Sequence, residues 1–158
     1  MPAEPEISGR FVVLAADADA LMLRAVDSAR VLTLIDPPAF DRWTVLDATL
    51  VSADALGLTM RAAAVEDHFT VALVAQDERP TTRSRAAAAT LPAGGSTFLP
   101  RQDAGGTDVI ALAAADHTAA RQQLAADVEP IVLRAARLDV RRVELRSAPG
   151  VLTVRYLP

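Results

Sequence analysis

The two histidines of the chain are its best candidates for acid–base or metal chemistry, and each follows an aspartate. The pairs are Asp67-His68 and Asp116-His117. An imidazole beside a carboxylate is typical of hydrolytic metal sites and of general acid–base pairs. A zinc site needs three or four ligands that converge at about 2 Å, and nothing in the spacing brings the two pairs together. Aspartate and histidine are also ordinary cap and turn residues, so we expect no metal and no other cofactor.

Most other catalytic chemistry is excluded or unsupported by the composition. The chain has no cysteine, and all sixteen of its basic residues are arginines, which excludes disulfides, cysteine nucleophiles and Schiff-base lysines. No serine lies in a Gly-x-Ser-x-Gly elbow. The glycine pairs Gly94-Gly95 and Gly105-Gly106 lack the Gly-x-Gly-x-x-Gly frame of a dinucleotide site. We therefore expect a binding protein rather than an enzyme.

Arginine and aromatic side chains are the stronger candidates for binding. Exposed aromatics beside an arginine in or next to loop 36–42 would be typical interface anchors, although Phe40 and Trp43 would equally suit an inward-facing plug of the sheet. Arginines near the C-terminal end of the predicted helix either track phosphates or complement the helix dipole. The candidate interaction surface comprises eight residues: Phe40, Arg42, Trp43, Arg83, Arg85, Arg141, Arg142 and Arg146.

The charge of the chain is uneven along its length. Residues 1–78 hold five arginines and thirteen acidic residues (−8), whereas residues 79–158 hold eleven arginines and seven acidic residues (+4), which sum to −4. This asymmetry would suit an oriented partner or a head-to-tail pair of copies, and it is equally consistent with solvated faces. The acidic total and the lack of aromatics interleaved with the arginines argue against a nucleic-acid partner.

The element best suited to position these residues is a helix over residues 117–138. Its apolar residues recur every three or four positions, the spacing of one helical face. Pro130 lies within this pattern, so we expect a kink or a break near residues 127–130. We prefer one kinked helix because the apolar stripe keeps its phase. The stripe consists of Ala120, Leu124, Val128, Ile131, Ala135 and Leu138.

Short strands are predicted on both sides of this helix. Alternating apolar and polar residues, separated by turn residues, are typical of strands that bury one face. Residues 18–32 could instead form one helix, but their Asp-rich interruptions favour strands. The predicted strands lie at 11–14, 21–25, 31–35, 43–51, 56–60, 69–73, 109–113, 143–146 and 151–156.

These elements predict an α+β fold with an antiparallel, β-rich N-terminal part. A strand, the long helix and a β-hairpin would follow, with the helix packed on the sheet. We divide the chain into a disordered leader (1–8), a β part (9–77), a long loop or linker (78–106) and a β-α-β-β part (107–158). Each part alone has a marginal core, so we expect the two parts to pack as one domain.

Three functional hypotheses follow. The first is a non-catalytic protein-interaction or regulatory module that self-associates, as a homodimer for example, with any other protein partner unidentified. The second is a small-ligand binder or enzyme with a pocket between sheet and helix that uses His68 or His117. The third, which we favour least, is a nucleic-acid accessory protein that uses the C-terminal arginines. Without a signal-like N-terminal stretch or a run of about 18 apolar residues, we expect a cytoplasmic chain with no membrane partner.

Overall fold

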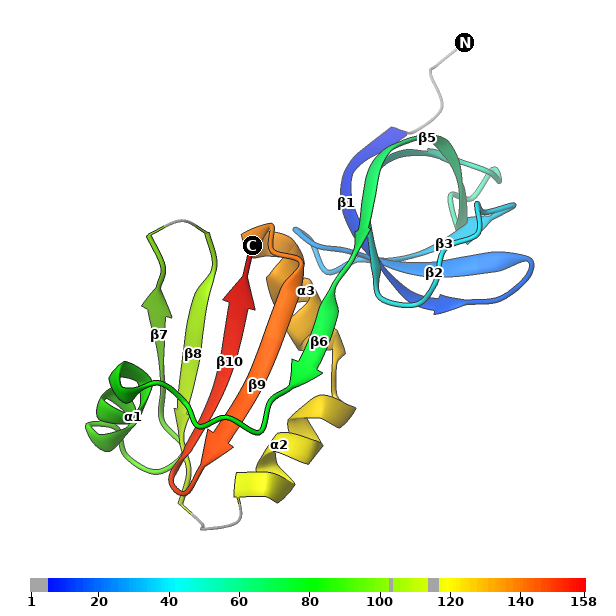
Figure 1. The fold of residues 1–158 in the computed structure, drawn as a ribbon. Coiled ribbons are helices and arrows are strands. Elements are labelled where there is room, and N and C mark those ends of the chain that lie inside the picture. Colours follow the sequence, from blue (N-terminus) through cyan, green and yellow to red (C-terminus); the bar gives the residue numbers. More distant parts are fainter. Residues whose placement is uncertain (1–5, 103, 114–116) are drawn as a thin grey trace. The chain divides into compact units, whose positions relative to one another are not determined.

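The computed structural model describes residues 6–102, 104–113 and 117–158. The chain divides into two compact units, Met1–Val71 and Ala72–Pro158. Within the described residues there are ten strands and three helices (Figure 1). The predicted α+β class with a β-rich N-terminal part is therefore confirmed. The expectation that the two parts pack as one domain stays a prediction.

The first unit is a closed five-stranded barrel with the strand order β1-β2-β3-β5-β4 (Figure 1). Neighbouring strands are antiparallel except β3 and β5, which are parallel. Five strands closed in this order have the architecture of an OB-fold, and the barrel closes where Thr33 pairs with Thr59 and Leu34 pairs with Met60. The strands are β1 (Glu6–Ala16), β2 (Ala20–Ala25), β3 (Val31–Ile35), β4 (Thr44–Ser52) and β5 (Thr59–Thr70).

Every second side chain along the strands points inward, and these side chains fill the barrel interior. In β2, Leu21 and Leu23 are buried whereas Met22 between them is exposed, so the strand interpretation of residues 18–32 is confirmed. Two register shifts between β4 and β5 mark bulges or irregularities, which bend a strand and help a sheet close. The barrel core consists of Phe11, Val13, Leu21, Leu23, Ala25, Leu32, Leu34, Leu46, Ala48, Leu50 and Met60.

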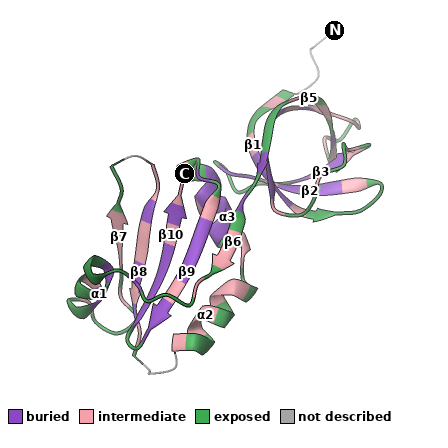
Figure 2. Ribbon diagram, in the orientation of Figure 1, coloured by how far each residue is buried: buried purple, intermediate pink, exposed green. Residues whose placement is uncertain are grey.

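The second unit is a five-stranded sheet with the order β6-β9-β10-β8-β7. All of its pairs are antiparallel except β6 and β9. Burial is greatest on the central strands β9 and β10, which have neighbours on both sides (Figure 2). The strands are β6 (Ala72–Ala75), β7 (Ser96–Pro100), β8 (Gly106–Ala111), β9 (Arg142–Ala148) and β10 (Val151–Leu157).

The expected long helix is two helices, α2 (His117–Ala126) and α3 (Glu129–Leu138). The break lies where it was predicted, because Pro130 lacks a hydrogen-bond donor and disfavours helix in the residue before it. The preference for one kinked helix was wrong. Helix α3 buries five residues against the sheet, whereas α2 has none classed as buried. No helix among the described residues is long and apolar enough to cross a membrane.

Three predicted segments have a different structure. Residues 78–106, expected as a loop or linker, contain helix α1 (Thr82–Ala89) and strand β7. Helix α1 begins at a Thr81 cap, and Ala88 packs against Val109, Ala148 and Val151. Residues 6–8 of the expected leader begin β1, and residues 1–5 lie outside the described part of the chain. Residues 56–58, expected in a strand, belong to the loop between β4 and β5.

Candidate functional site

The barrel exposes four large hydrophobic side chains, which we call the apolar wall. Leu56 and Leu58 are 81% and 70% exposed, and Met22 and Val31 are each 45% exposed. No other large hydrophobic residue in the described ranges is exposed to this degree. Clustered apolar exposure is a feature of binding surfaces, whereas isolated exposed residues need no explanation.

Strand register brings three residues of the apolar wall, Met22, Val31 and Leu58, to one region of the barrel. Met22 of β2 pairs with Thr33 of β3, and Thr33 pairs with Thr59, the first residue of β5. These three residues therefore lie side by side on adjacent strands. Because β3 and β5 are parallel, the residues just before Thr59 lie beside the start of β3, where Val31 is located. Leu58 thus lies at the same end of the wall as Val31.

Asp54 fixes the loop that carries the two leucines. Its carboxylate accepts hydrogen bonds from the backbone N–H groups of Leu56 (2.8 Å), Leu58 (3.1 Å) and Thr59 (2.7 Å), and from the Thr59 hydroxyl. The Thr59 hydroxyl and the Leu58 N–H lower the pKa of Asp54 to about 2. Gly57 adopts φ 68°, a left-handed conformation that favours glycine. The leucines are therefore held in an ordered loop.

The predicted aromatic anchors lie elsewhere on the barrel. Phe40 is half-buried against the barrel core, and its ring centroid lies 5.0 Å from that of His68. The Arg42 guanidinium lies 4.3 Å from the centroid of the Trp43 ring, and its Nε donates to the Leu14 carbonyl at 2.9 Å. Phe40 therefore packs against the core while part of it stays exposed. The role of Phe40, Arg42 and Trp43 in binding stays a prediction.

The two histidines belong to different units and have ordinary local partners. His68 lies in β5, where its backbone N–H donates to the Asp67 carboxylate at 2.9 Å. His117 begins α2, and its Nδ1 lies 2.8 Å from the Ser147 hydroxyl. Asp116 lies outside the described residues. Among the residues that are described, no group of three His, Cys, Asp or Glu side chains could hold a metal ion.

A pocket between sheet and helices does exist in the second unit, but neither histidine lines it. Its volume is about 360 Å³, and its polar lining residues are Ser96, Asp108, Arg134 and Tyr156. Arg134 Nε lies 3.1 Å from Asp108 Oδ2, and its guanidinium lies 4.9 Å from the centroid of the Phe98 ring. Burial raises the pKa values of Asp108 and Tyr156. The ion pair between Arg134 and Asp108 is by itself a structural reason for these polar residues to lie there.

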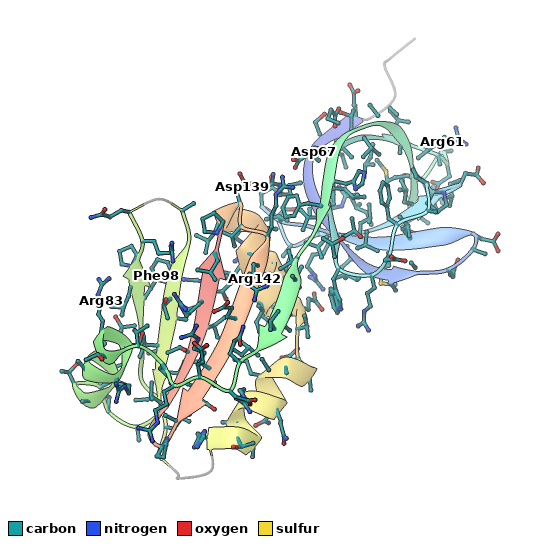
Figure 3. All side chains as sticks on the ribbon, in the orientation of Figure 1. Arg61, Asp67, Arg83, Phe98, Asp139 and Arg142 are labelled. Atoms are coloured by element: carbon teal, nitrogen blue, oxygen red, sulfur yellow. The ribbon has the colours of Figure 1, made fainter. Side chains whose placement is uncertain are left out.

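The predicted arginines of the second unit lie on two elements. Helix α1 carries Arg83 and Arg85, whereas Arg142 and Arg146 lie on β9 and Arg141 immediately precedes it. Figure 3 labels Arg83 and Arg142 on these two elements. The eight residues of the predicted surface are thus divided between both units and several elements.

Arg142 and Arg146 are engaged by a buried carboxylate. Arg142 Nε and Arg146 Nη2 lie 3.2 Å from the two oxygens of Glu144, which is 8% exposed. Arg155 of β10, which the sequence analysis did not single out, lies 3.3 Å from the same carboxylate. The alternating register of β9 and β10 explains this grouping, because Glu144 pairs directly with Arg155.

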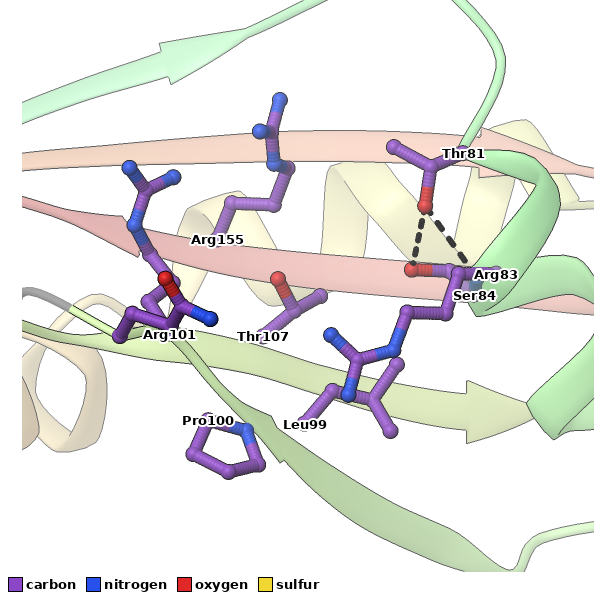
Figure 4. Close-up of a pocket in the computed structure, with 9 residues that line it drawn as sticks. Thr81, Arg83, Ser84, Leu99, Pro100, Arg101, Thr107 and Arg155 are labelled. Carbon is purple, nitrogen blue, oxygen red and sulfur yellow. Dashed lines mark hydrogen bonds between the residues drawn. The ribbon is translucent and has the colours of Figure 1, made fainter.

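Arg83 instead lines an open pocket, which we call the arginine pocket (Figure 4). The volume of this pocket is about 720 Å³. Its polar lining includes Arg101, Thr107 and Arg155 in addition to Arg83. Sequence reasoning missed this grouping because the three arginines come from distant positions in the chain.

Comparison with known proteins assigns the chain to one family. The family model described as "Family of unknown function (DUF5812)" matches residues 7–147. The chain belongs to this family. No curated protein and no solved structure matches the chain.

The DUF5812 match contains the whole apolar wall and two of the three arginines of the pocket. Arg155 lies beyond its C-terminal limit at residue 147. The sequence signal that could have revealed the wall is local, since Leu56 and Leu58 flank a glycine just after Asp54. Asp54 at the start of such a segment is typical of a turn that its side chain organises.

Proposed function

We propose that the chain is a non-catalytic protein-interaction module and that two copies pair through the apolar wall. The observation that carries this proposal is the exposure of Leu56 and Leu58, at 81% and 70%, on a loop held by Asp54. Burying these side chains against a second copy would remove apolar surface from water. Because the loop is already ordered, association would cost little further conformational entropy.

The charges around the wall suit a second copy. A two-fold interface places the same patch opposite itself, so a patch of one charge sign would repel its copy. Here Arg24 pairs directly with Val31, and Asp54 lies in the neighbouring loop. Both signs are therefore present, and each copy can place an arginine near a carboxylate of the other.

The same surface does not suit nucleic acid. Residues 1–71 hold five arginines and eleven acidic residues, a net charge of −6 that repels phosphates. In OB-folds the β2–β3 face and the β4–β5 loop carry the ligand site, and the apolar wall lies in this region. Single-strand binders place stacking aromatics and a basic groove there. None of the four residues of the wall is aromatic.

The expected dimer is weak. Four side chains per copy cover less than the roughly 800 Å² per partner of a standard interface. We therefore expect a dissociation constant in the micromolar range or above.

Sedimentation equilibrium of the full chain, up to about 0.5 mM, tests this proposal. The wild-type chain should approach twice its mass of 16.7 kDa as concentration rises. The variant Leu56→Ser/Leu58→Ser should stay at one chain mass with an unchanged unfolding temperature. The variant Ala63→Ser/Ala64→Ser, which changes two exposed β5 residues outside the wall, should still dimerise.

Two outcomes would overturn the proposal. If the wild-type chain stayed monomeric at every concentration, the wall would have to bind a different protein. A dimer that persists in Leu56→Ser/Leu58→Ser would place the interface elsewhere.

A further inference from the structure

Three guanidinium groups from three separate elements surround the arginine pocket. Arg83 comes from α1, Arg101 directly follows β7, and Arg155 comes from β10. Their side chains extend around one open space, with the Thr107 hydroxyl among them (Figure 4). The fold thus gathers cations that are up to 72 positions apart in the sequence, since 155 − 83 = 72. Such a cluster repels itself unless an anion compensates it.

No carboxylate on the described lining serves these arginines, and the nearest buried one is shared. No acidic residue is among the described residues that line the pocket. The buried Glu144 is shared by Arg142, Arg146 and Arg155. Burial lowers the pKa of Arg155, as do the charges of Arg146 and Arg101, whereas the charge of Glu144 opposes them. Among the described residues, Arg83 has no ionic partner.

The start of helix α1 borders the same pocket. Thr81 caps the helix by accepting from the Ser84 N–H at 3.2 Å, and its hydroxyl lies 3.0 Å from that of Ser84. Both residues line the pocket, and the first turn of α1 contains no acidic residue. The positive end of the helix dipole is therefore left for an anion.

This combination selects a phosphate group. Guanidinium forks match the geometry of phosphate oxygens, and three forks suit a group with several charged oxygens better than a single carboxylate. The pocket, at about 720 Å³, is much larger than one phosphate ion and leaves room for an organic portion. Leu99 and Pro100 give it an aliphatic side, and none of its described lining residues is aromatic, so a nucleobase would find no ring to stack on.

We propose that the arginine pocket binds a small aliphatic phosphate monoester. Arg83, Arg101 and Arg155 hold the phosphate group, and the carbon portion lies against Leu99 and Pro100. This site lies in the second unit and does not depend on the apolar wall.

Calorimetric titration of the full chain with glycerol 3-phosphate tests this site. At low salt the wild-type chain should bind, and affinity should fall as salt screens the charges. Arg83→Gln should weaken binding about tenfold, as expected for one charge-assisted contact. Arg85→Gln is the matched control, because it removes the same charge from the same helix. Arg85 is exposed, bonds to Thr82 and does not line the pocket, so this variant should bind as the wild type does.

Further variants separate binding from folding and from the dimer. Arg101→Gln should weaken binding by a similar factor, whereas Arg155→Gln also removes a partner of Glu144 and is interpreted only with its unfolding curve. Arg83→Lys keeps the charge without the fork and should fall between wild type and Arg83→Gln. Leu56→Ser/Leu58→Ser should bind glycerol 3-phosphate normally, so failure here and failure of the dimer are distinguishable.

Several results would overturn the site. One is that glycerol 3-phosphate gives no heat of binding. Another is that Arg83→Gln binds it as tightly as the wild type does, and a third is that Arg85→Gln loses as much affinity as Arg83→Gln. Inorganic phosphate that binds as tightly as glycerol 3-phosphate would remove the organic portion of the assignment. An oligonucleotide that binds more tightly through the same arginines would replace the small ligand by a nucleic acid.

Discussion

The carboxylate of Asp54 accepts two hydrogen bonds from Thr59, one from its backbone N–H at 2.7 Å and one from its hydroxyl. This double contact joins the start of the β4–β5 loop to the first residue of β5. The same carboxylate also accepts from the N–H groups of Leu56 and Leu58. One acidic side chain therefore organises the loop that exposes the two leucines.

Replacing Asp54 by alanine should loosen this loop. The affinity of the proposed dimer should fall by about tenfold, because the loop would then have to become ordered when two copies associate. Amide hydrogen exchange at Leu56 and Leu58 should accelerate, while exchange in the barrel core stays slow. Asp19→Ala, which removes an exposed acid from the β1–β2 turn, is the control. Equal exchange rates in Asp54→Ala and wild type would contradict the role of Asp54.

The loop should also respond to acid. The pKa of Asp54 is about 2 in the folded chain and about 3.9 in an unfolded one. A lowered pKa gives a stabilising contribution that is complete above about pH 4 and is lost as pH falls through 2. The amide shifts of Leu56 and Leu58 in an NMR titration should therefore change with a midpoint near pH 2. A midpoint near pH 4 would show that the carboxylate is not held.

Glu144 should contribute to the stability of the second unit. Burial alone would raise its pKa, but the hydrogen bond from Arg142 and the charges of Arg146 and Arg155 outweigh burial and lower it. Glu144→Gln should lower the free energy of unfolding by about 1–3 kcal/mol, because the arginines lose their shared anion. Urea unfolding of the variant and the wild-type chain measures this difference in free energy.

The exposed partner of the same network provides a control for Glu144→Gln. Glu78 is 71% exposed and lies 3.2 Å from Arg146. Glu78→Gln should therefore cost less than about 1 kcal/mol, as surface ion pairs do. Similar losses in the two variants would contradict the burial argument.

Two glycines with nearly the same backbone conformation should differ in their tolerance of alanine. Gly105 and Gly94 have φ of 82° and 81°. A Cβ at Gly105 would collide with the Tyr156 carbonyl, whereas a Cβ at Gly94 meets nothing within 4 Å. Gly94→Ala should cost only about 1–2 kcal/mol for the left-handed conformation, and Gly105→Ala distinctly more. Thermal unfolding compares the two variants, and equal decreases in their unfolding temperatures would contradict the collision at Gly105.

Local patterns predicted most of the elements correctly. The alternation of Leu21, Met22 and Leu23 gave a strand, and Pro130 marked the helix break, because both effects depend on neighbouring residues alone. The same alternation failed at Leu56 and Leu58. There the Asp54 carboxylate takes backbone N–H groups that a strand would have used for pairing.

The sites were harder to predict than the elements. Phe40 and Trp43 stood out as aromatics, but aromatic side chains fill cores as readily as they cover interfaces. The arginine pocket had no local signal, because its three arginines lie on separate elements. Arg83 lies on a helix, Arg101 follows an edge strand and Arg155 lies on a central strand.

The sequence by itself determined the α+β class, the exclusion of thiol and lysine chemistry, and the acidic character of the first 71 residues. These properties depend on composition and on short-range periodicity. Only the tertiary structure decided that β3 and β5 pair to close a barrel, and that three distant arginines meet around one pocket. Strand pairing is a long-range choice made by the whole packed chain, and no local pattern encodes which strands become neighbours.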